Sequence, residues 1–241
     1  MTEAAPGLDS RDTPGAGALF IICAPSGAGK TSLVRALVGR VPRLAVSVSH
    51  TTRKRRPGER EGRDYHFVER DRFEHMLAEN ALLEHALVFD HYYGTSQQWV
   101  ERVLRTRDVI LEIDWQGARQ IRARAPDAVS IQVLPPSLET LEERLKRRGQ
   151  DTHETIARRM RDAIEEMTHL AEFDYIVVND HFERALAELE AIVMAERART
   201  ARRLGRSRDL VGRLLGPRGS GILANALAGQ SASRMPAERK D

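Results

Sequence analysis

A short apolar run that leads into a glycine-rich turn is the feature of this sequence that most restricts its fold. Residues Leu19–Cys23 are all apolar, and Ala24-Pro25-Ser26-Gly27-Ala28-Gly29-Lys30-Thr31 follows at once. This octapeptide fits the pattern G-x-x-x-x-G-K-S/T, except that Ala24 takes the first glycine position. The pattern is meaningful between a buried strand and a helix, so the sequence predicts a strand, a phosphate-binding loop and a helix in that order.

The residue types of this loop suit a nucleoside triphosphate. Gly27 and Gly29 let the backbone turn its N–H groups toward phosphate, Lys30 adds a cation, and Thr31 offers a hydroxyl to Mg²⁺. We therefore expect ATP to contact Ala24, Pro25, Ser26, Gly27, Ala28, Gly29, Lys30, Thr31 and Ser32. A glycine-rich turn that binds nothing is the alternative, and the loop alone does not separate a kinase from a GTPase or a motor.

Short apolar runs alternate with helical patterns along the rest of the chain. The predicted strands are Leu19–Cys23, Val109–Ile113, Val129–Leu134 and Tyr175–Val178, and the helices that follow them are about Lys30–Gly39, Trp115–Ala125, Leu138–Arg148 and Phe182–Arg199. This alternation predicts an α/β fold with a doubly wound parallel sheet. Residues 50–96 depart from this alternation of strands and helices, which indicates an inserted small α+β lobe. Its predicted elements are strands near Tyr65–Val68 and Leu82–Phe89 and a helix at Arg70–Glu79.

Composition narrows the class of protein further. No apolar run approaches the roughly 20 residues of a membrane-spanning helix, and the Pro- and Gly-rich start is unlike a signal peptide. We expect a cytoplasmic protein without membrane contact. The 241 residues are enough for one folding unit, and Cys23, the single cysteine, lies in an apolar run that is typical of an inert buried thiol.

The basic charge of the chain is concentrated at its end. Residues 197–241 contain 11 Lys and Arg against 3 Asp and Glu, so residues 1–196 have a net charge of −5 although the whole chain has +3. A nucleic-acid-binding protein would carry its basic face on its folded part, so we expect no nucleic-acid partner. Residues 1–17 and those beyond about 217 are predicted to be disordered, and residues 204–241 form a basic extension for which a nucleic-acid or anionic-membrane role stays open.

Several motifs further along the chain resemble those of the guanylate kinase family. The segment from Ser49 to Glu59, Ser-His-Thr-Thr-Arg-Lys-Arg-Arg-Pro-Gly-Glu, is similar to the family's S-x-T-T-R-x-x-R-x-G-E. Glu61–Phe67, Leu83–Ala86, Tyr92–Thr95, Asp114–Gly117 and Val177–Asp180 follow in the order of the family's other motifs. The resemblance covers about residues 18–203 and implies a GMP-binding lobe at 50–96 and a helical lid at 144–160. It also implies Mg²⁺-dependent phosphoryl transfer from ATP to GMP and dGMP, in purine nucleotide metabolism.

The residues of these motifs suit a purine monophosphate in their own right. The guanidinium groups of Arg53 and Arg56, with the hydroxyls of Tyr65 and Tyr93, match the oxygens of a dianionic phosphate. A solvated surface loop is the alternative for so arginine-rich a segment. The carboxylate of Glu84 can accept from both adjacent donors of guanine, whereas adenine presents an acceptor at N1. A surface charge at a strand end is the alternative for Glu84.

Other residues enter the predicted site through the resemblance. It implies that Ser49 and Thr95 contact the O6 edge of guanine, with Gly94 beside them, and that Asn179 contacts ATP. Two acids, Glu112 and Asp114, alternate with apolar residues at strand period, so their side chains are expected to point the same way. Carboxylates at the end of a buried strand need a compensating partner, so we expect both acids, with Thr31, to contact Mg²⁺, directly or through water, and the nucleotide. Glu112 departs from the family's usual Asp.

The family's lid arginines correspond to Arg144, Arg148 and Arg159, with Gly149 as a hinge. We expect these arginines to close over both nucleotides, exclude water and act with Lys30 and Arg53 in the chemical step. No general base is needed, because the attacking oxygen belongs to a phosphate that is largely dianionic at neutral pH. A protein-binding scaffold that has lost ATP chemistry, or a kinase that acts on a phosphorylated sugar, are the alternatives.

Overall fold

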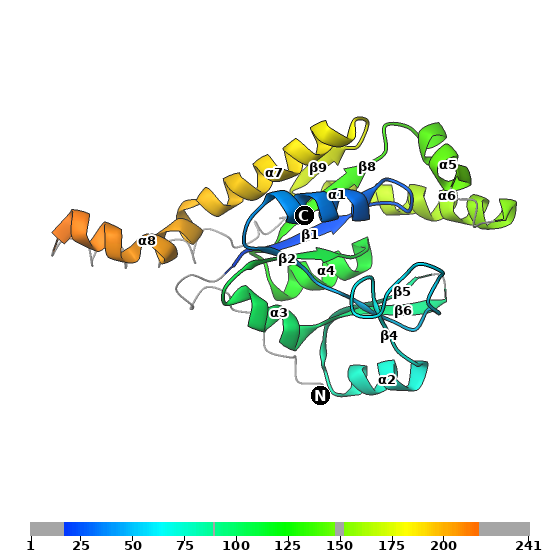
Figure 1. The fold of residues 1–241 in the computed structure, drawn as a ribbon, viewed down its shortest axis with the longest axis horizontal. Coiled ribbons are helices and arrows are strands. Elements are labelled where there is room, and N and C mark those ends of the chain that lie inside the picture. The colour runs from blue at the N-terminus through cyan, green and yellow to red at the C-terminus, as the bar shows by residue number, and fades with distance from the viewer. Residues whose placement is uncertain (1–16, 89, 148–151, 217–241) are drawn as a thin grey trace, which may run out of the picture.

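A parallel sheet forms the centre of the computed structural model, which describes residues 17–88, 90–147 and 152–216 (Figure 1). The sheet has the order β2-β7-β1-β8-β9, and these strands are Leu44–Val46, Asp108–Glu112, Leu19–Cys23, Val129–Leu134 and Tyr175–Val178. All four neighbouring pairs are parallel. The predicted α/β fold with a doubly wound parallel sheet is thereby confirmed.

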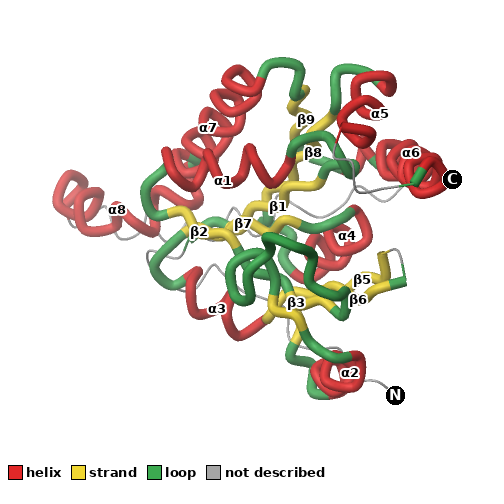
Figure 2. Tube along the Cα trace, turned by 45° about the vertical axis from the view of Figure 1, so that its right-hand side comes forward, coloured by secondary structure: helices red, strands yellow, loops and turns green. Residues whose placement is uncertain are grey.

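Helices cover both faces of this sheet, as Figure 2 shows. Phe20 and Ile22 of β1 pack with helices α1 (Lys30–Arg40) and α7 (Phe182–Ala198) on one face. Ile21 and Cys23 pack with α3 (Gln97–Leu104) and α4 (Trp115–Arg124) on the other face. Successive side chains of a strand point to opposite faces, so a strand covered on both sides is apolar throughout. Every residue of β1 is accordingly buried.

A second, four-stranded sheet lies within residues 50–96. Its order is β4-β3-β6-β5, with strands His66–Phe67, His50–Thr51, His91–Ser96 and Leu82–Val88, and helix α2 spans Arg70–Ala78. Phe73, Met76 and Leu82 form its small apolar core. Gly94 in β6 is required by this packing, because a Cβ there would lie 2.9 Å from Leu82 Cδ1 and 3.0 Å from the Phe73 ring.

Three further helices and a 3₁₀ turn complete the described chain. Helix α5 (Leu138–Arg147) packs on α6 (His153–Thr168), and the turn η1 (Leu170–Glu172) leads to β9. Thr152 is the N-cap of α6, and its hydroxyl accepts the Thr155 N–H group. Helix α8 (Thr200–Leu215) follows α7 and projects from the body of the molecule (Figure 1). No helix in the described ranges is long and apolar enough to cross a membrane.

Several elements differ from the sequence prediction. The strand predicted at Val109–Ile113 is Asp108–Glu112, and the short strands β2, β3 and β6 were not predicted. Helix α8 occupies the first part of the segment that we treated as a basic extension. The disorder predicted for the leader and for residues beyond about 217 concerns positions that, apart from Gly17, lie outside the described residues.

Candidate active site

The glycine-rich loop joins β1 to α1 at the carboxyl edge of the sheet. Gly27 and Gly29 have φ angles of 100° and 96°, a region that a residue with a Cβ rarely adopts. A Cβ on Gly27 would also lie 3.0 Å from Leu141 Cδ1 of α5. The loop therefore has the conformation that exposes backbone N–H groups at a helix N-terminus, and it is packed against α5.

Lys30 is the first residue of α1, and its side chain crosses to the neighbouring strand. The Nζ atom donates to the Ile113 carbonyl over 3.0 Å, and the Thr31 hydroxyl donates to Glu112 Oε2 over 3.0 Å. Burial acts to lower the pKa of Lys30, but surrounding negative charges, foremost Glu166 and also Glu112, raise the pKa above its usual value. Lys30 is thus a charged ammonium group behind the loop.

Asn179 and Arg144 tie the loop to β9 and α5. The Asn179 amide donates to the Ala28 carbonyl over 2.7 Å, and Arg144 donates to the Asn179 carbonyl over 3.0 Å and to the Ala28 carbonyl over 3.5 Å. A Cβ on Gly29 would collide with the Asn179 amide. Asn179, which was expected at the ATP site, and Arg144, which was expected in the lid, therefore both contact the loop.

Glu84 lies in β5, and its carboxyl packs against Gly117 of α4. It is 3% exposed, and its Oε1 accepts the Thr95 hydroxyl over 2.5 Å. A Cβ on Gly117 would lie 2.6 Å from Glu84 Oε2, so the glycine leaves the room that this carboxyl occupies. Burial raises the pKa of Glu84 to about 7, although the hydrogen bond from Thr95 acts in the opposite direction. A buried carboxyl of this kind is suited to bind a ligand that offers hydrogen-bond donors.

Arg53 is held in a fixed orientation by its neighbours. Its two terminal nitrogens donate to the two carboxylate oxygens of Glu59 over 3.1 and 2.7 Å, and its Nε donates to the Tyr93 hydroxyl over 3.3 Å. The guanidinium carbon lies 5.3 Å from the centre of the Tyr65 ring, which meets the Tyr93 ring edge to face at 5.8 Å. Burial acts to raise the pKa of Glu59, but the hydrogen bond from Arg53 is among the interactions that lower it below its usual value.

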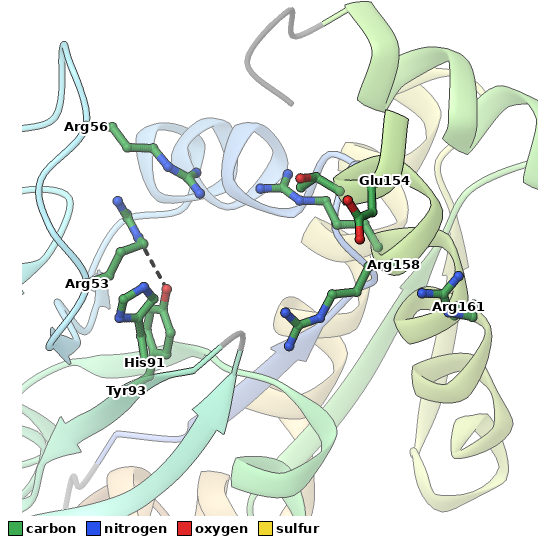
Figure 3. Close-up of a pocket in the computed structure, with 9 residues that line it drawn as sticks. Arg53, Arg56, His91, Tyr93, Glu154, Arg158 and Arg161 are labelled. Carbon is green, nitrogen blue, oxygen red and sulfur yellow. Dashed lines mark hydrogen bonds between the residues drawn. The ribbon is translucent and has the colours of Figure 1, made fainter. Parts of the chain in front are cut away.

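Arg53 and Tyr93 belong to one wall of an arginine-rich cavity of about 320 Å³, shown in Figure 3. Arg53, Arg56, His91 and Tyr93 come from the small lobe. The opposite wall comes from helix α6, through Glu154, Thr155, Arg158, Arg159 and Arg161. Arg159 is 8% exposed, and Arg158 pairs with Asp90 of the lobe over 3.4 Å. A cavity surrounded by guanidinium groups on two sides is suited to a phosphate anion.

The expected geometry of the two acids was wrong in one respect. Strand β7 ends at Glu112, so Asp114 does not lie on the strand but is the N-cap of α4. Its carboxylate accepts the Gly117 N–H group over 3.0 Å and the Gln116 amide over 3.0 Å. An N-cap side chain accepts an N–H group that has no partner within the helix. Asp114 therefore belongs to the start of α4, and β7 ends before it. Of the two acids, Glu112 is the one in contact with Thr31.

The residues that were expected at the O6 edge of guanine lie on neighbouring strands of the small sheet. Ser49 is 9% exposed and immediately precedes β3, whose His50 pairs with Gly94, one residue before Thr95. Arg148 and the hinge Gly149 lie outside the described residues. Cys23 is fully buried, and burial raises the pKa of its thiol, as expected of an inert cysteine.

Sequence reasoning missed three residues with roles in this arrangement. Glu59 orients Arg53, Gly117 makes room for Glu84, and Glu166 of α6 influences the pKa of Lys30. Glu59 and Gly117 belong to motifs that the sequence analysis had quoted, so a closer reading of those motifs would have found them. Glu166 lies in an ordinary charged helical segment, and no sequence pattern singles it out.

Comparisons with known proteins agree with this geometry. A family model described as guanylate kinase matches residues 16–196. A guanylate kinase of Methylococcus capsulatus is 57% identical over 201 residues, which cover 83% of this chain and 98% of that protein. A guanylate kinase of Alcanivorax borkumensis is 56% identical over 203 residues, covering 84% and 98%. The crystal structure of guanylate kinase from Anaplasma phagocytophilum superimposes with a TM-score of 0.69 at 31% identity, covering 82% of this chain and 95% of that one.

Proposed function

The chain belongs to the guanylate kinase family, a family of ATP-dependent GMP kinases, and we propose how its residues carry out that reaction. GMP occupies the space between the small lobe and α6, and ATP lies along the glycine-rich loop. The observation that carries this assignment is the pairing of a buried carboxyl, Glu84, with an arginine-lined cavity on the same lobe. The carboxyl recognises the guanine base, and the arginines of the cavity bind the phosphate of GMP.

Glu84, a buried residue of the small lobe, recognises the guanine base. The two adjacent donors of guanine, N1–H and the exocyclic amine, pair with the carboxylate, and Thr95 and Ser49 lie on the side of O6. Gly117 leaves the room in which the Glu84 carboxyl lies, and so allows the carboxyl to take this position. AMP would place its N1 acceptor against this carboxylate and leave a buried negative group unpaired, a mismatch of the kind that gives about 10⁴-fold discrimination. The same contacts accept dGMP, because none of them involves the ribose.

The phosphate of GMP binds to Arg53, Arg56, Tyr65 and Tyr93. Glu59 fixes the guanidinium plane of Arg53 in advance, so less side-chain freedom is lost on binding. Arg159 approaches the same phosphate from α6. Arg148 is proposed for the same role on the basis of the family motif alone.

ATP binds with its phosphates on the backbone N–H groups of residues 24–32 and with Lys30 beside them. Thr31 and Glu112 fit Mg²⁺, since both are hard oxygen donors, their oxygens are 3.0 Å apart, and Mg²⁺ is commonly held by one or two protein oxygens together with phosphates and water. When bound, the ion neutralises charge on the transferred group. Asp114, which caps α4, is proposed to act on the nucleotide or the ion only through water.

Transfer then requires alignment and charge neutralisation more than acid–base chemistry. Lys30, Arg144 and Arg159 stabilise negative charge on the transferred phosphoryl group, and the dianionic GMP phosphate attacks without a general base. Helix α6 and the lobe exclude water that would otherwise accept the phosphoryl group. The reaction is one of purine nucleotide metabolism, and we propose that it takes place in the cytoplasm, without a nucleic-acid or membrane partner.

An acceptor screen tests this proposal. ADP release from ATP and Mg²⁺ is measured with GMP, dGMP, AMP, UMP and ribose phosphates as acceptors. We expect turnover with GMP and dGMP and at least 10³-fold lower kcat/KM for the others. Release with a sugar phosphate but not with GMP would favour the sugar-kinase alternative, and no release with any acceptor would favour the scaffold.

A further inference from the structure

Strand β5, which carries Glu84, is an edge strand of the small sheet. In the order β4-β3-β6-β5, it pairs with β6 on one side only. The N–H and C=O groups on the other side of an edge strand need partners from elsewhere. Helix α4, which packs on the parallel sheet, also packs beside β5, as Figure 2 shows. The side chains of α4 can therefore reach the unpaired groups of β5.

The pairing of β5 with β6 is irregular immediately before Glu84. Between Leu82 and Glu84 the register shifts, so that two steps along β5 correspond to one step along β6. Such a β-bulge turns the side chains that follow it to the face opposite to the one that regular alternation would give. Leu82 lies in the apolar cluster of α2, and Leu83 lies in the cluster that includes residues of α4. The Glu84 carboxyl also packs against α4, at Gly117, so the bulge is what turns this acid toward the helix.

Gln120 of α4 pairs with the main chain immediately after Glu84. Its amide nitrogen donates to the His85 carbonyl over 2.6 Å, and its amide oxygen accepts the His85 N–H group over 3.2 Å. A glutamine amide has the same donor and acceptor as a peptide group, so it pairs with His85 as a neighbouring strand would. Gln120 therefore fixes the main chain of β5 one residue beyond the acid that recognises guanine.

Arg124, one helical turn further along α4, contacts the bulge itself. Its guanidinium group donates to the Leu83 carbonyl over 2.7 Å and to the Leu82 carbonyl over 3.4 Å. Gly117, Gln120 and Arg124 are three and four residues apart in sequence, so they lie on one face of the helix. This face of α4 thus contacts β5 on both sides of the guanine-recognising acid and leaves room for its carboxyl.

We propose that Gln120 is a positioning residue for guanine recognition, which holds β5 in the register that turns Glu84 toward the base. This proposal rests on the function assigned above. Without the two hydrogen bonds to His85, the strand can lose its bulge, and a shift of one residue in register turns a side chain to the opposite face. The carboxyl then leaves the place where it accepts from guanine. Gln120 acts through the strand, so its effect should disappear when Glu84 is replaced.

Two variants of Gln120 and one control test the contact itself. Gln120→Met keeps the length of the side chain but loses both hydrogen bonds to His85. Gln120→Glu keeps the acceptor for the His85 N–H group and places a negative charge at the His85 carbonyl. Gln98→Met, on the exposed side of α3, is the matched control. Hydrogen exchange of the His85 amide, measured by NMR, should be about tenfold faster in Gln120→Met than in wild type and in Gln98→Met.

Steady-state kinetics with two acceptors give the functional measurement. GMP and IMP differ only in the exocyclic amine, one of the two donors that Glu84 accepts, so the ratio of their kcat/KM values reports the position of the carboxyl. Gln120→Met should raise the KM for GMP about tenfold, lower the GMP to IMP ratio about tenfold and leave the KM for ATP unchanged. A purely structural loss would instead lower kcat for both acceptors and leave the ratio as in wild type.

A double-mutant cycle with Glu84→Gln tests whether the effect passes through the acid. In that background, Gln120→Met should change the GMP to IMP ratio less than about twofold. An unchanged ratio in Gln120→Met, an unchanged exchange rate of the His85 amide, or an equal effect in both backgrounds would overturn the proposal. If circular dichroism shows that Gln120→Met misfolds, Gln120→Glu takes its place and must lower the ratio at least about threefold.

Wild-type kinetics separate this proposal from the proposed function. Absence of GMP turnover in wild type would refute the reaction itself. A wild type that prefers GMP to IMP, together with unaltered Gln120 variants, refutes only the role of Gln120.

Discussion

Replacing Glu84 by glutamine should make the free protein more stable but raise the KM for GMP. The carboxyl has a pKa of about 7 in the folded chain against 4.5 as its reference value. The folded state therefore binds more protons than the unfolded state between these pH values, and stability falls as the pH rises through that window. At 1.36 kcal/mol per pKa unit, the ionised carboxyl costs about 3 kcal/mol above pH 7. Glutamine carries no such cost, and it can still accept the Thr95 hydroxyl.

Two assays measure the effects of Glu84→Gln on the stability of the free protein and on the KM for GMP. Urea unfolding should give Glu84→Gln a gain of about 1 kcal/mol at pH 5.5 and about 3 kcal/mol at pH 8. The amide offers guanine one acceptor and one misplaced donor, so the loss of a charge-assisted hydrogen bond should raise the KM for GMP about 100-fold. Glu79→Gln, at the exposed end of α2, is the control and should change neither quantity. A KM for GMP within about threefold of wild type, or a stability gain that does not depend on pH, would refute the reasoning.

Two further substitutions test the rest of the site. Lys30→Ala should reduce turnover by at least about 10³-fold with a retained circular dichroism spectrum, because the buried ammonium beside the loop has no substitute; near-normal turnover would remove Lys30 from the mechanism. Gly117→Ala should raise the KM for GMP about tenfold without altering the KM for ATP, since its Cβ would lie 2.6 Å from Glu84 Oε2. Gly39→Ala, where a Cβ meets nothing within 4 Å, is its control, and equal GMP kinetics in the two variants would contradict the account.

Long, strongly patterned elements were predictable from the sequence. Strands β1, β8 and β9 have the predicted bounds. Strand β1 is an uninterrupted apolar run because it is covered on both faces, whereas β8 includes Ser130 and Gln132 and β9 exposes Ile176 and Val178. The short strands β2, β3 and β6 were missed for a related reason. Strand β6 reads His-Tyr-Tyr-Gly-Thr-Ser, which is polar because it belongs to the binding lobe, and its pairing with β5 exists only in the tertiary structure.

The candidate site was predictable where it depends on a motif and not where it depends on packing. The loop residues, Glu84, Arg53 and Arg56 were predicted from motifs, and Arg159 from its match to a lid position. Arg158 and Arg161, which also line the cavity, were not predicted. The capping role of Asp114 was missed because alternation with Ile113 imitates a strand one residue longer than the real one. The influence of Glu166 on the pKa of Lys30 depends on the tertiary packing of α6, which no local pattern encodes.

The most direct test of the central claim is a crystal structure with GMP, Mg²⁺ and a non-hydrolysable ATP analogue. The account predicts that guanine N1 and its exocyclic amine lie within hydrogen-bond distance of the Glu84 carboxylate, with the GMP phosphate on Arg53 and the triphosphate on residues 24–32. A guanine base bound away from Glu84, or a triphosphate bound outside this loop, would contradict it.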